Sequence, residues 1–595
     1  MAWTLVLALF SVALVGQLTA IPFDDRLFGA LLMEDGESGA EADEPKMTTF
    51  QLPTDLKPTG YEIHVEPDLP KAEFSGQAKI TVQVEIATSN IVLNAKYIEV
   101  GNESVRVTRI NKRRPINHHV TNVTFDDPNE QMIISLAEPL VRNGVYVVEI
   151  AYTGILGKDM MGFYLSKYRA NGKDKLLAST QFEATGARRA FPCFDQPNYK
   201  VPFIINITRE NHLTAISNMP LKHSIVGSTK TTDTFIKSPN MPTYLVGFSV
   251  FEFDKLSTKD ETFRVWGRED VIQKQGKYIF EKGPLILNKL SEYMGIDYYT
   301  IMPKMDLVAV PDFDAGAMEN WGMTTYRDIY LLADTERTKA ARLEDVVSVV
   351  VHESSHQWFG DLVTPMKWDH AWLNEAFATF FEYAGTSWVE PTWRMEDLFV
   401  VEQVQVAFNA DLKGSHAMTS STTTPESVSA TFDHIIYNKG GSVLRMIENA
   451  ITPALFKESL QHYLKVASED YGGSVDPDTL WDAFDDILFP PPNTTVAASL
   501  LPKNVESIRD VTHEWINKPG FPLVTFTRNY TTNVTTVTQH RFLLKKADMD
   551  ADNTTWTIPL TYTTASQASF QPRDNLMWFP KTEQSVEIPQ DGSKQ

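Results

Sequence analysis

The chain has 595 residues, and 76 acidic against 54 basic side chains give it a formal net charge of −22. Nucleic-acid binding and binding to an acidic membrane surface both require a cationic face, so this charge excludes those classes and we expect no nucleic-acid partner. Hydrophobic residues make up 43% and charged residues 22% of the sequence, which excludes intrinsic disorder for most of the chain.

The amino terminus carries a predicted signal peptide. An unbroken stretch of apolar and small residues covers Trp3–Val15 and is followed by the small residue Ala20, which predicts a secretory signal over residues 1–20. A buried terminal helix is the alternative. The acidic stretch Glu34–Lys46 predicts a flexible leader over residues 21–47. We therefore expect a secreted, extracellular glycoprotein. Its Asn-x-Ser/Thr sequons are Asn102, Asn122, Asn206, Asn493, Asn529, Asn533 and Asn553.

No later segment has the 18 or more consecutive apolar residues that a membrane span requires. The carboxyl end, Ser585–Gln595, is polar, so the hydrophobic tail of a lipid-anchor signal is also missing. We expect no transmembrane segment in this chain, and a membrane tether would require a longer form of it.

The remaining sequence divides into three parts by hydrophobic pattern. Period-two alternation such as that of Ala78–Ile86 predicts a β domain over residues 48–254. Longer stretches of helical period predict a helix-rich domain over residues 255–516, and Thr- and Val-rich alternation predicts a second β domain over residues 517–595. The expected helices cover Arg342–Phe359, Ala371–Ala384, Gly440–Ile451 and Thr479–Phe489.

The motif with the clearest chemistry is His-Glu-Ser-Ser-His at residues 352–356. Residues four apart share a helix face, so His352 and His356 can bind one metal ion while Glu353 points to a bound water. Valines precede the motif and Trp358 follows it, so this helix should be largely buried. Buried imidazoles and a buried carboxylate need partners, and a metal ion supplies one.

Catalytic zinc sites use three protein ligands and leave one position open. Glu375 lies in the next apolar helical segment, with eighteen residues between it and His356, a gap that fits one turn between two packed helices. On its own, Glu375 could equally be a solvated helix carboxylate. Together, His352, His356 and Glu375 predict a zinc site.

With this site, the sequence resembles the M1 zinc aminopeptidases, an aminopeptidase N-like group of gluzincins. The spacing of the two histidines and the glutamate is that of the family's zinc motif. Three further blocks match in the family's order, between about Leu52 and Phe521. These blocks are Thr180–Pro197, Gly316–Gly322 (GAMENWG) and Phe432–Gly440.

The resemblance implies a multidomain α+β fold. Its expected parts are an N-terminal β-sheet saddle domain, a thermolysin-like α/β catalytic domain and a small C-terminal β-sandwich. It also implies one Zn²⁺ per chain, held by His352, His356 and Glu375. Glu353 would then be the general base, and Tyr437 would donate a hydrogen bond to the oxyanion as it forms.

The resemblance further implies how peptide substrates bind. Glu183 and Glu319 would bind the free α-ammonium group, which a mid-chain peptide bond cannot supply, so the enzyme would be an exopeptidase. Gly316 and Ala317 would align the substrate as an added strand. The first side-chain pocket would be lined by Met318, Gln181 and Phe182.

Ala315, just before the GAMENWG block, resembles the residue of neutral, broad-specificity members, so we expect neutral or broad side-chain preference. Asp314 beside it offers a preference for basic side chains as the alternative. Cys193, the only cysteine, is expected to be a packed thiol.

The carboxyl end differs from the family pattern. Extracellular relatives continue through a last strand of the third domain into a helical domain that covers the catalytic cleft. This chain stops near Ile588, so we expect it to be truncated before the helical domain, with an incomplete β-sandwich. An unpaired strand edge and exposed apolar surface would follow.

Two other functions compete with a secreted zinc aminopeptidase. One is a non-catalytic binding or receptor-like protein that keeps the fold, although no ligand, base or tyrosine is lost from the sequence. The other is a thermolysin-like endopeptidase, which shares the histidine motif. Glu183 and the Gly316–Asn320 block argue against an endopeptidase.

Overall fold

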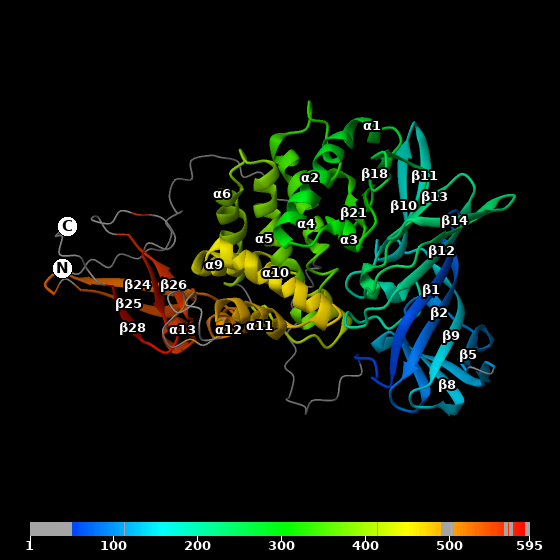
Figure 1. Ribbon diagram of the computed structural model, residues 1–595, viewed down its shortest axis with the longest axis horizontal. Coiled ribbons are helices and arrows are strands. Elements are labelled where there is room, and N and C mark those ends of the chain that lie inside the picture. Colours follow the sequence, from blue (N-terminus) through cyan, green and yellow to red (C-terminus); the bar gives the residue numbers. More distant parts are fainter. Residues whose placement is uncertain are drawn as a thin grey trace.

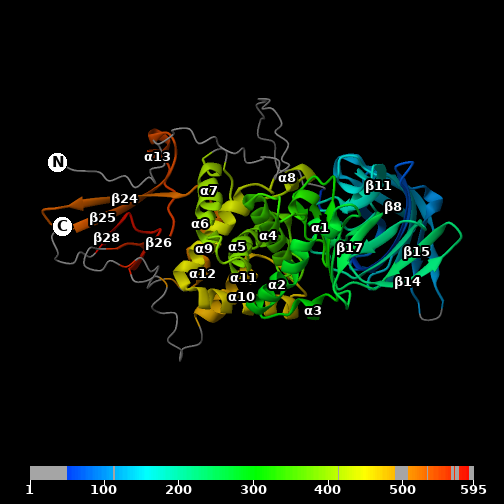
Figure 2. The same ribbon diagram turned by 90° about the horizontal axis from the view of Figure 1, so that it is seen from above.

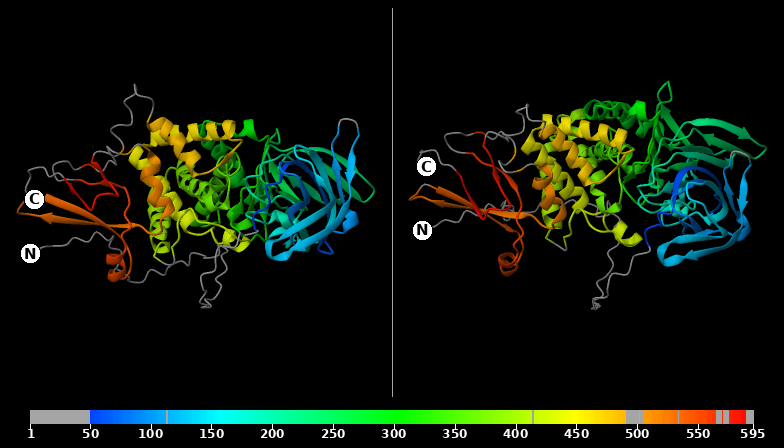
Figure 3. Two further views of the ribbon diagram at one scale, coloured as in Figure 1. Left: turned by 90° about the horizontal axis from the view of Figure 1, so that it is seen from below. Right: turned by 60° about the horizontal axis from the view of Figure 1, so that its bottom comes forward.

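The computed structural model describes residues 50–111, 114–412, 415–489, 501, 505, 507–532, 534–563, 569 and 575–588. The predicted signal peptide (1–20), the predicted acidic leader (21–47) and the sequons at Asn493 and Asn533 lie outside these residues. Three parts follow one another along the long axis: a β-rich part, a helical part and a small β part (Figure 1). Figures 2 and 3 show the same order from other sides. The predicted multidomain α+β fold is confirmed.

The β-rich part is organised around a nine-stranded sheet. In spatial order its strands are β14 (Leu221–Val226), β15 (Lys230–Phe235), β12 (Phe203–Glu210), β1 (Leu56–Asp68), β2 (Glu73–Val84), β9 (Val145–Ile155), β5 (Val105–Arg109) and β6 (Ile116–His118), with β4 (Ile98–Glu99) on β9. Strand β2 confirms its predicted alternation, because Ala78, Ile80 and Val82 are buried while Lys79 between them is exposed.

Two smaller sheets complete this part. One contains β3 (Thr88–Asn94), β8 (Gln131–Leu140) and β7 (Val120–Asp126); the other contains β10 (Gly162–Ala170), β11 (Lys173–Gln181), β16 (Phe248–Phe251) and β13 (Thr214–Ser217). Strand β11 ends at Gln181, two residues before Glu183. The sequon residue Asn206 lies within β12, where its Oδ1 accepts a hydrogen bond from Thr234 at 2.8 Å. Glycosylation stays a prediction.

A buried ion-pair network joins distant segments of the β-rich part. The guanidinium of Arg188, 1% exposed, donates from Nε to Asp195 Oδ2 at 2.9 Å and from Nη1 to Glu130 Oε2 at 2.9 Å. Thr243 donates a further hydrogen bond to Asp195 at 2.6 Å. Cys193, which lies between Arg188 and Asp195 in the sequence, is a buried free thiol, as predicted.

The Arg188→Met variant should lose about 3–5 kcal/mol of unfolding free energy, because it leaves Asp195 and Glu130 buried without their cation. Its neighbour provides a matched control. Arg189 pairs with Asp159, whose side chain is 57% exposed, so Arg189→Met should cost less than about 1 kcal/mol. Urea unfolding of both variants measures the difference, and equal losses would contradict the assignment of a buried network.

The helical part contains a mixed five-stranded sheet and most of the helices. The strands, in spatial order, are β17 (Phe253–Ser257), β18 (Phe263–Arg268), β19 (Met305–Val310), β21 (Met323–Arg327) and β20 (Ala317–Met318). The helices are α1 (Ile272–Gln275), α2 (Lys277–Met294), α3 (Tyr298–Ile301), α4 (Ala340–His356), α5 (Trp372–Val389), α6 (Met395–Phe399), α7 (Gln405–Ala410), α8 (Pro425–Ser429), α9 (Gly440–Ile451), α10 (Pro453–Asp470), α11 (Pro477–Leu488) and α12 (Ile508–Asn517). The four helices expected from sequence are confirmed as α4, α5, α9 and α11.

Helices α4 and α5 pack against each other at the centre of the helical part (Figure 1). Their close approach depends on Gly385, where an added Cβ would lie 2.6 Å from Val351 Cγ1. The connection between them is longer than the single turn that we predicted. It contains β22 (Thr364–Pro365), which pairs with β23 (Ser474–Val475), and the turn η7 (Trp368–His370). The connection is longer because Thr364 and Pro365 within it also form a strand of a second sheet.

The small β part follows α12. Its strands are β24 (Pro522–Asn529), β25 (Val534–Arg541) and β28 (Ser585–Ile588) in one sheet and β26 (Ile558–Thr561) and β27 (Leu576–Phe579) in another, with helix α13 (Lys546–Ala551). Trp515 on α12 donates from Nε1 to the Thr557 carbonyl at 3.0 Å and so ties this part to the helices. The boundaries predicted at residues 254 and 516 stay predictions. Within the described ranges, no helix has the length and apolarity needed to cross a membrane.

Candidate metal centre and active site

Helices α4 and α5 bring the three predicted zinc ligands together. His352 and His356 lie one turn apart at the end of α4, and Glu375 lies in the first turn of α5. Glu375 Oε2 lies 3.4 Å from His352 Nε2 and 3.3 Å from His356 Nε2. His356 and Glu375 are 1% and 2% exposed. Three ligand atoms on two packed helices therefore converge on one point.

The two imidazoles are oriented as metal ligands. His352 Nδ1 donates a hydrogen bond to Glu382 Oε2 at 3.1 Å, and His356 Nδ1 donates to the Phe359 carbonyl at 2.9 Å. A proton on Nδ1 leaves the lone pair of a neutral imidazole on Nε2, which faces Glu375. Sequence reasoning missed Glu382. It follows Glu375 by seven residues, two turns along the same helix face, and this spacing was a usable signal.

The Glu382→Leu variant should weaken zinc binding by about 10–100-fold, because His352 loses the carboxylate that fixes its ring and tautomer. Competition with a chromophoric chelator measures the change in affinity. Glu344→Gln, two turns before His352 on α4, is the matched control and should bind zinc like the parent chain. An unchanged affinity in Glu382→Leu would remove the orienting role.

The charges around the three ligands favour the binding of a cation. Burial acts to raise the pKa of Glu375, but His356 and His352 lower it to about 2. Burial acts to lower the pKa of His356, but Glu319 and Glu375 raise it to about 9. Two imidazole Nε2 atoms and one carboxylate oxygen are the donor set of a three-ligand catalytic zinc site. The residues present therefore fit a zinc ion.

Glu353 and Glu319 lie beside this centre. Ligand atoms of Glu319, Glu353 and His356 lie within 4.8 Å of one another. Glu353 Oε2 and Glu319 Oε1 are buried without a hydrogen-bond partner in the described chain. Burial raises the pKa of Glu353 to about 8, with the two histidines acting in the opposite direction. The free carboxylate oxygen of Glu353 therefore lies within reach of the metal centre, as the predicted general base requires.

Gln357 fixes the position of Glu319 against α4. Its Nε2 donates to the carbonyls of Glu319 and Glu353, both at 3.2 Å, and its Oε1 accepts from Gly322 N at 3.2 Å. Gln357 is fully buried. Sequence reasoning missed this residue, because its partner Glu319 is far away in the chain and no local pattern marks the contact.

The predicted residues around the amino group and first side chain also meet. Gln181 Nε2 lies 3.4 Å from Met318 Sδ. Glu183 Oε1 is buried without a described hydrogen-bond partner, and burial followed by the nearby charge of Glu319 raises the pKa of Glu183. Phe182 is fully buried and its ring packs against Phe191 and Phe248, and its place in the side-chain pocket stays a prediction.

Gly316 and Ala317 lie where a substrate strand could be added. Ala317 pairs with Tyr326 across β20 and β21, and the Gly316 carbonyl accepts a hydrogen bond from Arg327 N at 2.9 Å. Strand β20 is the last strand of its sheet, so among the described strands none pairs with its outer edge. An extended peptide can pair with such an edge through its own backbone.

Tyr437 lies next to the imidazole of His352. It belongs to the π-helical turn η9 (Ile435–Lys439) before α9, and its ring centroid lies 6.2 Å from that of His352 at an interplanar angle of 17°. Burial and then Glu375 raise the pKa of Tyr437, so its hydroxyl keeps its proton and can donate. Lys439 anchors the turn through an ion pair with Asp411 and a hydrogen bond to the Gly520 carbonyl, each at 3.0 Å.

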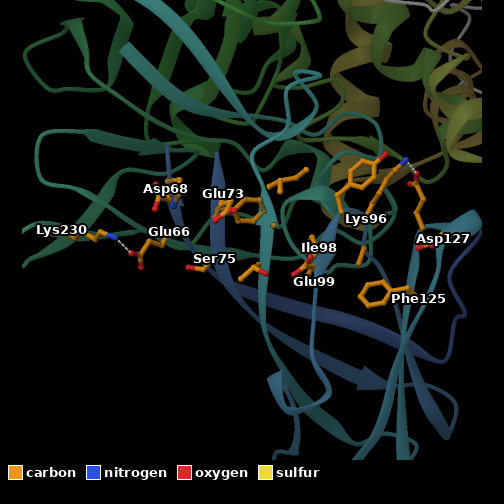
Figure 4. Close-up of a pocket in the computed structure, with 18 residues that line it drawn as sticks. Glu66, Asp68, Glu73, Ser75, Lys96, Ile98, Glu99, Phe125, Asp127 and Lys230 are labelled. Atoms are coloured by element: carbon orange, nitrogen blue, oxygen red, sulfur yellow. Dashed lines mark hydrogen bonds and ion pairs between the residues drawn. The ribbon is translucent and has the colours of Figure 1, made fainter. Parts of the chain in front are cut away.

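A large cavity of about 1260 Å³ lies elsewhere, in the β-rich part (Figure 4). Its lining contains no histidine or cysteine and none of the predicted site residues. Lys230 pairs there with Glu66 at 2.6 Å, and Lys96 pairs with Glu130. The charged groups are thus partly neutralised by one another, and the lining offers no imidazole or thiolate donor for a zinc ion.

Comparison with known proteins covers both large parts of the chain. The family model for the peptidase M1 N-terminal domain matches residues 57–245, and the model for the peptidase family M1 domain matches residues 278–515. The second match contains the metal centre.

Individual proteins similar to this chain are named aminopeptidases. The chain is 36% identical to aminopeptidase Ey of Gallus gallus over 87% of its own length and 54% of the relative's. It is 34% identical to aminopeptidase N of Rattus norvegicus (86% and 54%) and 33% identical to aminopeptidase A of Gloydius brevicauda (88% and 52%). The chain spans about half the length of these relatives.

Proposed function

The chain belongs to peptidase family M1, and from this premise we propose that it is a zinc aminopeptidase that removes single residues from the free amino termini of peptides. One observation carries the proposal: the His352–His356–Glu375 centre lies beside Glu353 and Glu319, whose buried carboxylates face it. A metal centre next to an anionic site is what hydrolysis at a free amino terminus requires.

Different acidic residues bind the substrate and transfer the proton. Glu183 and Glu319 bind the α-ammonium group of the substrate, because each has a carboxylate oxygen without a hydrogen-bond partner in the described chain and two such carboxylates attract a cation. The edge of β20 pairs with the peptide backbone, and Met318 with Gln181 lines the pocket for the first side chain. The polarisable thioether of a buried methionine suits neutral side chains of several shapes, so we propose broad neutral specificity.

When bound, one zinc ion supplies Lewis acidity that polarises the scissile carbonyl and acidifies water. Glu353 takes the proton from the attacking water on its carboxylate and delivers it to the leaving amine. The Tyr437 hydroxyl donates a hydrogen bond to the carbonyl oxygen as that oxygen gains negative charge. The ligands, the base and the tyrosine all lie together, so no observation favours the non-catalytic alternative.

The direct test compares aminoacyl anilides with their N-acetylated counterparts, using the purified chain loaded with zinc. We expect cleavage of leucine and alanine anilides and no cleavage of the acetylated forms. Cleavage of acetylated substrates would exclude an aminopeptidase and support an endopeptidase. Secretion stays a prediction, and expression of the chain with and without residues 1–20, followed by assay of the medium, tests it.

The Glu319→Gln variant should raise KM for free-amine substrates more than it lowers kcat, because the amide no longer carries the charge that binds an ammonium group. We expect KM to rise by about 10–100-fold, which corresponds to the loss of about 1.5–3 kcal/mol from one charge-assisted hydrogen bond. Steady-state kinetics on leucine anilide measures both constants. An unchanged KM would detach Glu319 from amine binding.

A further inference from the structure

The two carboxylates that bind the substrate's amino group come from different parts of the chain. Glu183 follows β11 of the β-rich part by two residues, and Glu319 directly follows β20 of the helical part. Two like charges repel each other, so these carboxylates do not hold one another in place. Their separation is set by the contacts that hold the two backbone segments together.

Asn218, which follows β13, connects these two segments. Its Nδ2 donates to the Trp321 carbonyl at 3.0 Å and to the Leu245 carbonyl at 2.8 Å, and its Oδ1 accepts from Gly247 N at 2.8 Å. The backbone N–H of Asn218 also donates to the Gly247 carbonyl at 3.2 Å. Asn218 is 1% exposed. Because the side-chain amide uses both its donors and its oxygen, its orientation is determined.

The bond from Asn218 to Trp321 fixes the backbone next to Glu319. Two side chains of the helical part hold the same segment. Gln357 donates to the Glu319 carbonyl at 3.2 Å, and Lys304 donates to the carbonyl three residues later at 2.8 Å. Asn218 adds a third contact, and this one comes from the β-rich part.

The bonds to Leu245 and Gly247 fix the backbone next to Glu183. Gly247 leads directly into β16, which pairs antiparallel with β11. At the start of β16, Phe248 N donates to Thr180 Oγ1 at 3.1 Å, three residues before Glu183. The same buried amide therefore holds the segments of both carboxylates.

We propose that Asn218 is a positioning residue that fixes the separation of Glu183 and Glu319 and thereby sets the affinity for the substrate's amino terminus. The proposal rests on the amine-binding role of the two glutamates set out above. Asn218 acts through the backbone of these residues and not by contact with the substrate. One ammonium group can bond both carboxylates only when each lies at about 2.7–2.9 Å, so a small shift of either segment weakens binding.

Removing the amide should weaken substrate binding. Asn218→Leu keeps nearly the size of the side chain but makes none of its three hydrogen bonds. It should raise KM for leucine anilide by about 5–30-fold and lower kcat less, because fewer hydrogen bonds then orient the two carboxylates. Asn218→Asp, which keeps the acceptor but loses both donors, should change KM in the same direction. Zinc affinity should stay parental, since none of these hydrogen bonds reaches a zinc ligand.

Asn94→Leu is the matched control. Asn94 lies in β3 of the β-rich part, is also 1% exposed, and accepts a hydrogen bond from Asp195 N at 3.2 Å. This variant should lose stability in urea unfolding but keep the parental KM. An unchanged KM in Asn218→Leu and Asn218→Asp, or an equal rise of KM in Asn94→Leu, overturns the proposal.

A double-mutant cycle separates positioning from a general loss of structure. When Glu319 is already replaced by glutamine, the separation of the two carboxylates no longer matters. Asn218→Leu should therefore raise KM by less than about two-fold in the Glu319→Gln background, whereas independent effects would multiply. Multiplied effects overturn the proposal.

Hydrogen exchange tests the contact without any activity measurement. The amide of Gly322 donates to Gln357 Oε1 at 3.2 Å, and it should exchange faster in Asn218→Leu than in Asn94→Leu, because the segment then opens more often. Mass spectrometry of peptides covering residues 316–326 measures the rate. Equal exchange in the two variants overturns the proposal.

The proposed function fails separately. A parent chain that cleaves free-amine substrates, with a KM that does not respond to Asn218, keeps the function and loses this role. A parent chain that cleaves no free-amine substrate removes the function, and the exchange experiment then still decides whether Asn218 holds the segment of Glu319.

Discussion

Replacing Glu353 by glutamine should lower kcat for leucine anilide by about 10²–10⁴-fold while the chain still binds zinc. The amide has nearly the same shape as the carboxylate but cannot take a proton from water. Glu353 contributes no atom to the group of His352, His356 and Glu375, so that group keeps its three ligands. Steady-state kinetics together with metal analysis of the same sample measures both quantities.

The control for this change is Glu292→Gln, the same substitution on an exposed position of α2, where the side chain is 59% exposed. It should keep parental kcat and KM. Activity of Glu353→Gln within a few-fold of the parent would assign the proton transfer to another group. Loss of zinc from Glu353→Gln would show instead that the Glu353 carboxylate is itself a zinc ligand.

The second large effect concerns the metal itself. His356→Ala should weaken zinc binding by more than about 100-fold, because it removes a direct ligand. Loss of a residue that only orients a ligand weakens binding by about 10–100-fold. His352 and Glu375 alone are too few ligands for a three-ligand zinc site, so tight binding should be lost. Activity should disappear with the metal, and added zinc should no longer raise the unfolding temperature, since ligand stabilisation depends on affinity.

His462→Ala is the matched control. His462 lies on α10 with its side chain 31% exposed and pairs with Asp486 at 3.0 Å, away from the metal centre. It should keep the parental zinc affinity, measured by chelator competition. One equivalent of tightly bound zinc in His356→Ala would contradict the ligand assignment.

Local geometry made part of the site predictable from the amino-acid sequence. A helix places residues four apart on one face, so His352, Glu353 and His356 could be recognised as a metal-binding turn before any fold was known. The same period predicted α4, α5, α9 and α11, and two-residue alternation predicted strands such as β2. These predictions succeeded because backbone geometry alone relates the residues.

The resemblance to a family extended the prediction to residues that no local period connects. Glu183 follows β11, Glu319 follows β20 and Tyr437 lies in η9, and the sequence between them carries no measure of their distance. Only the packing of a β-rich part against the helical part brings the charge of Glu319 close enough to raise the pKa of Glu183.

The contacts that position the site residues and shift their pKa values could be found only from the folded structure. Gln357 joins Glu319 to α4, and Lys439 anchors the turn of Tyr437 through Asp411 and Gly520, contacts between segments that are distant in sequence. The physical reason is that hydrogen bonds and burial depend on distances across the fold, which a local pattern does not encode. The close approach of Glu319 and Glu353 to the imidazole of His356 is of the same kind.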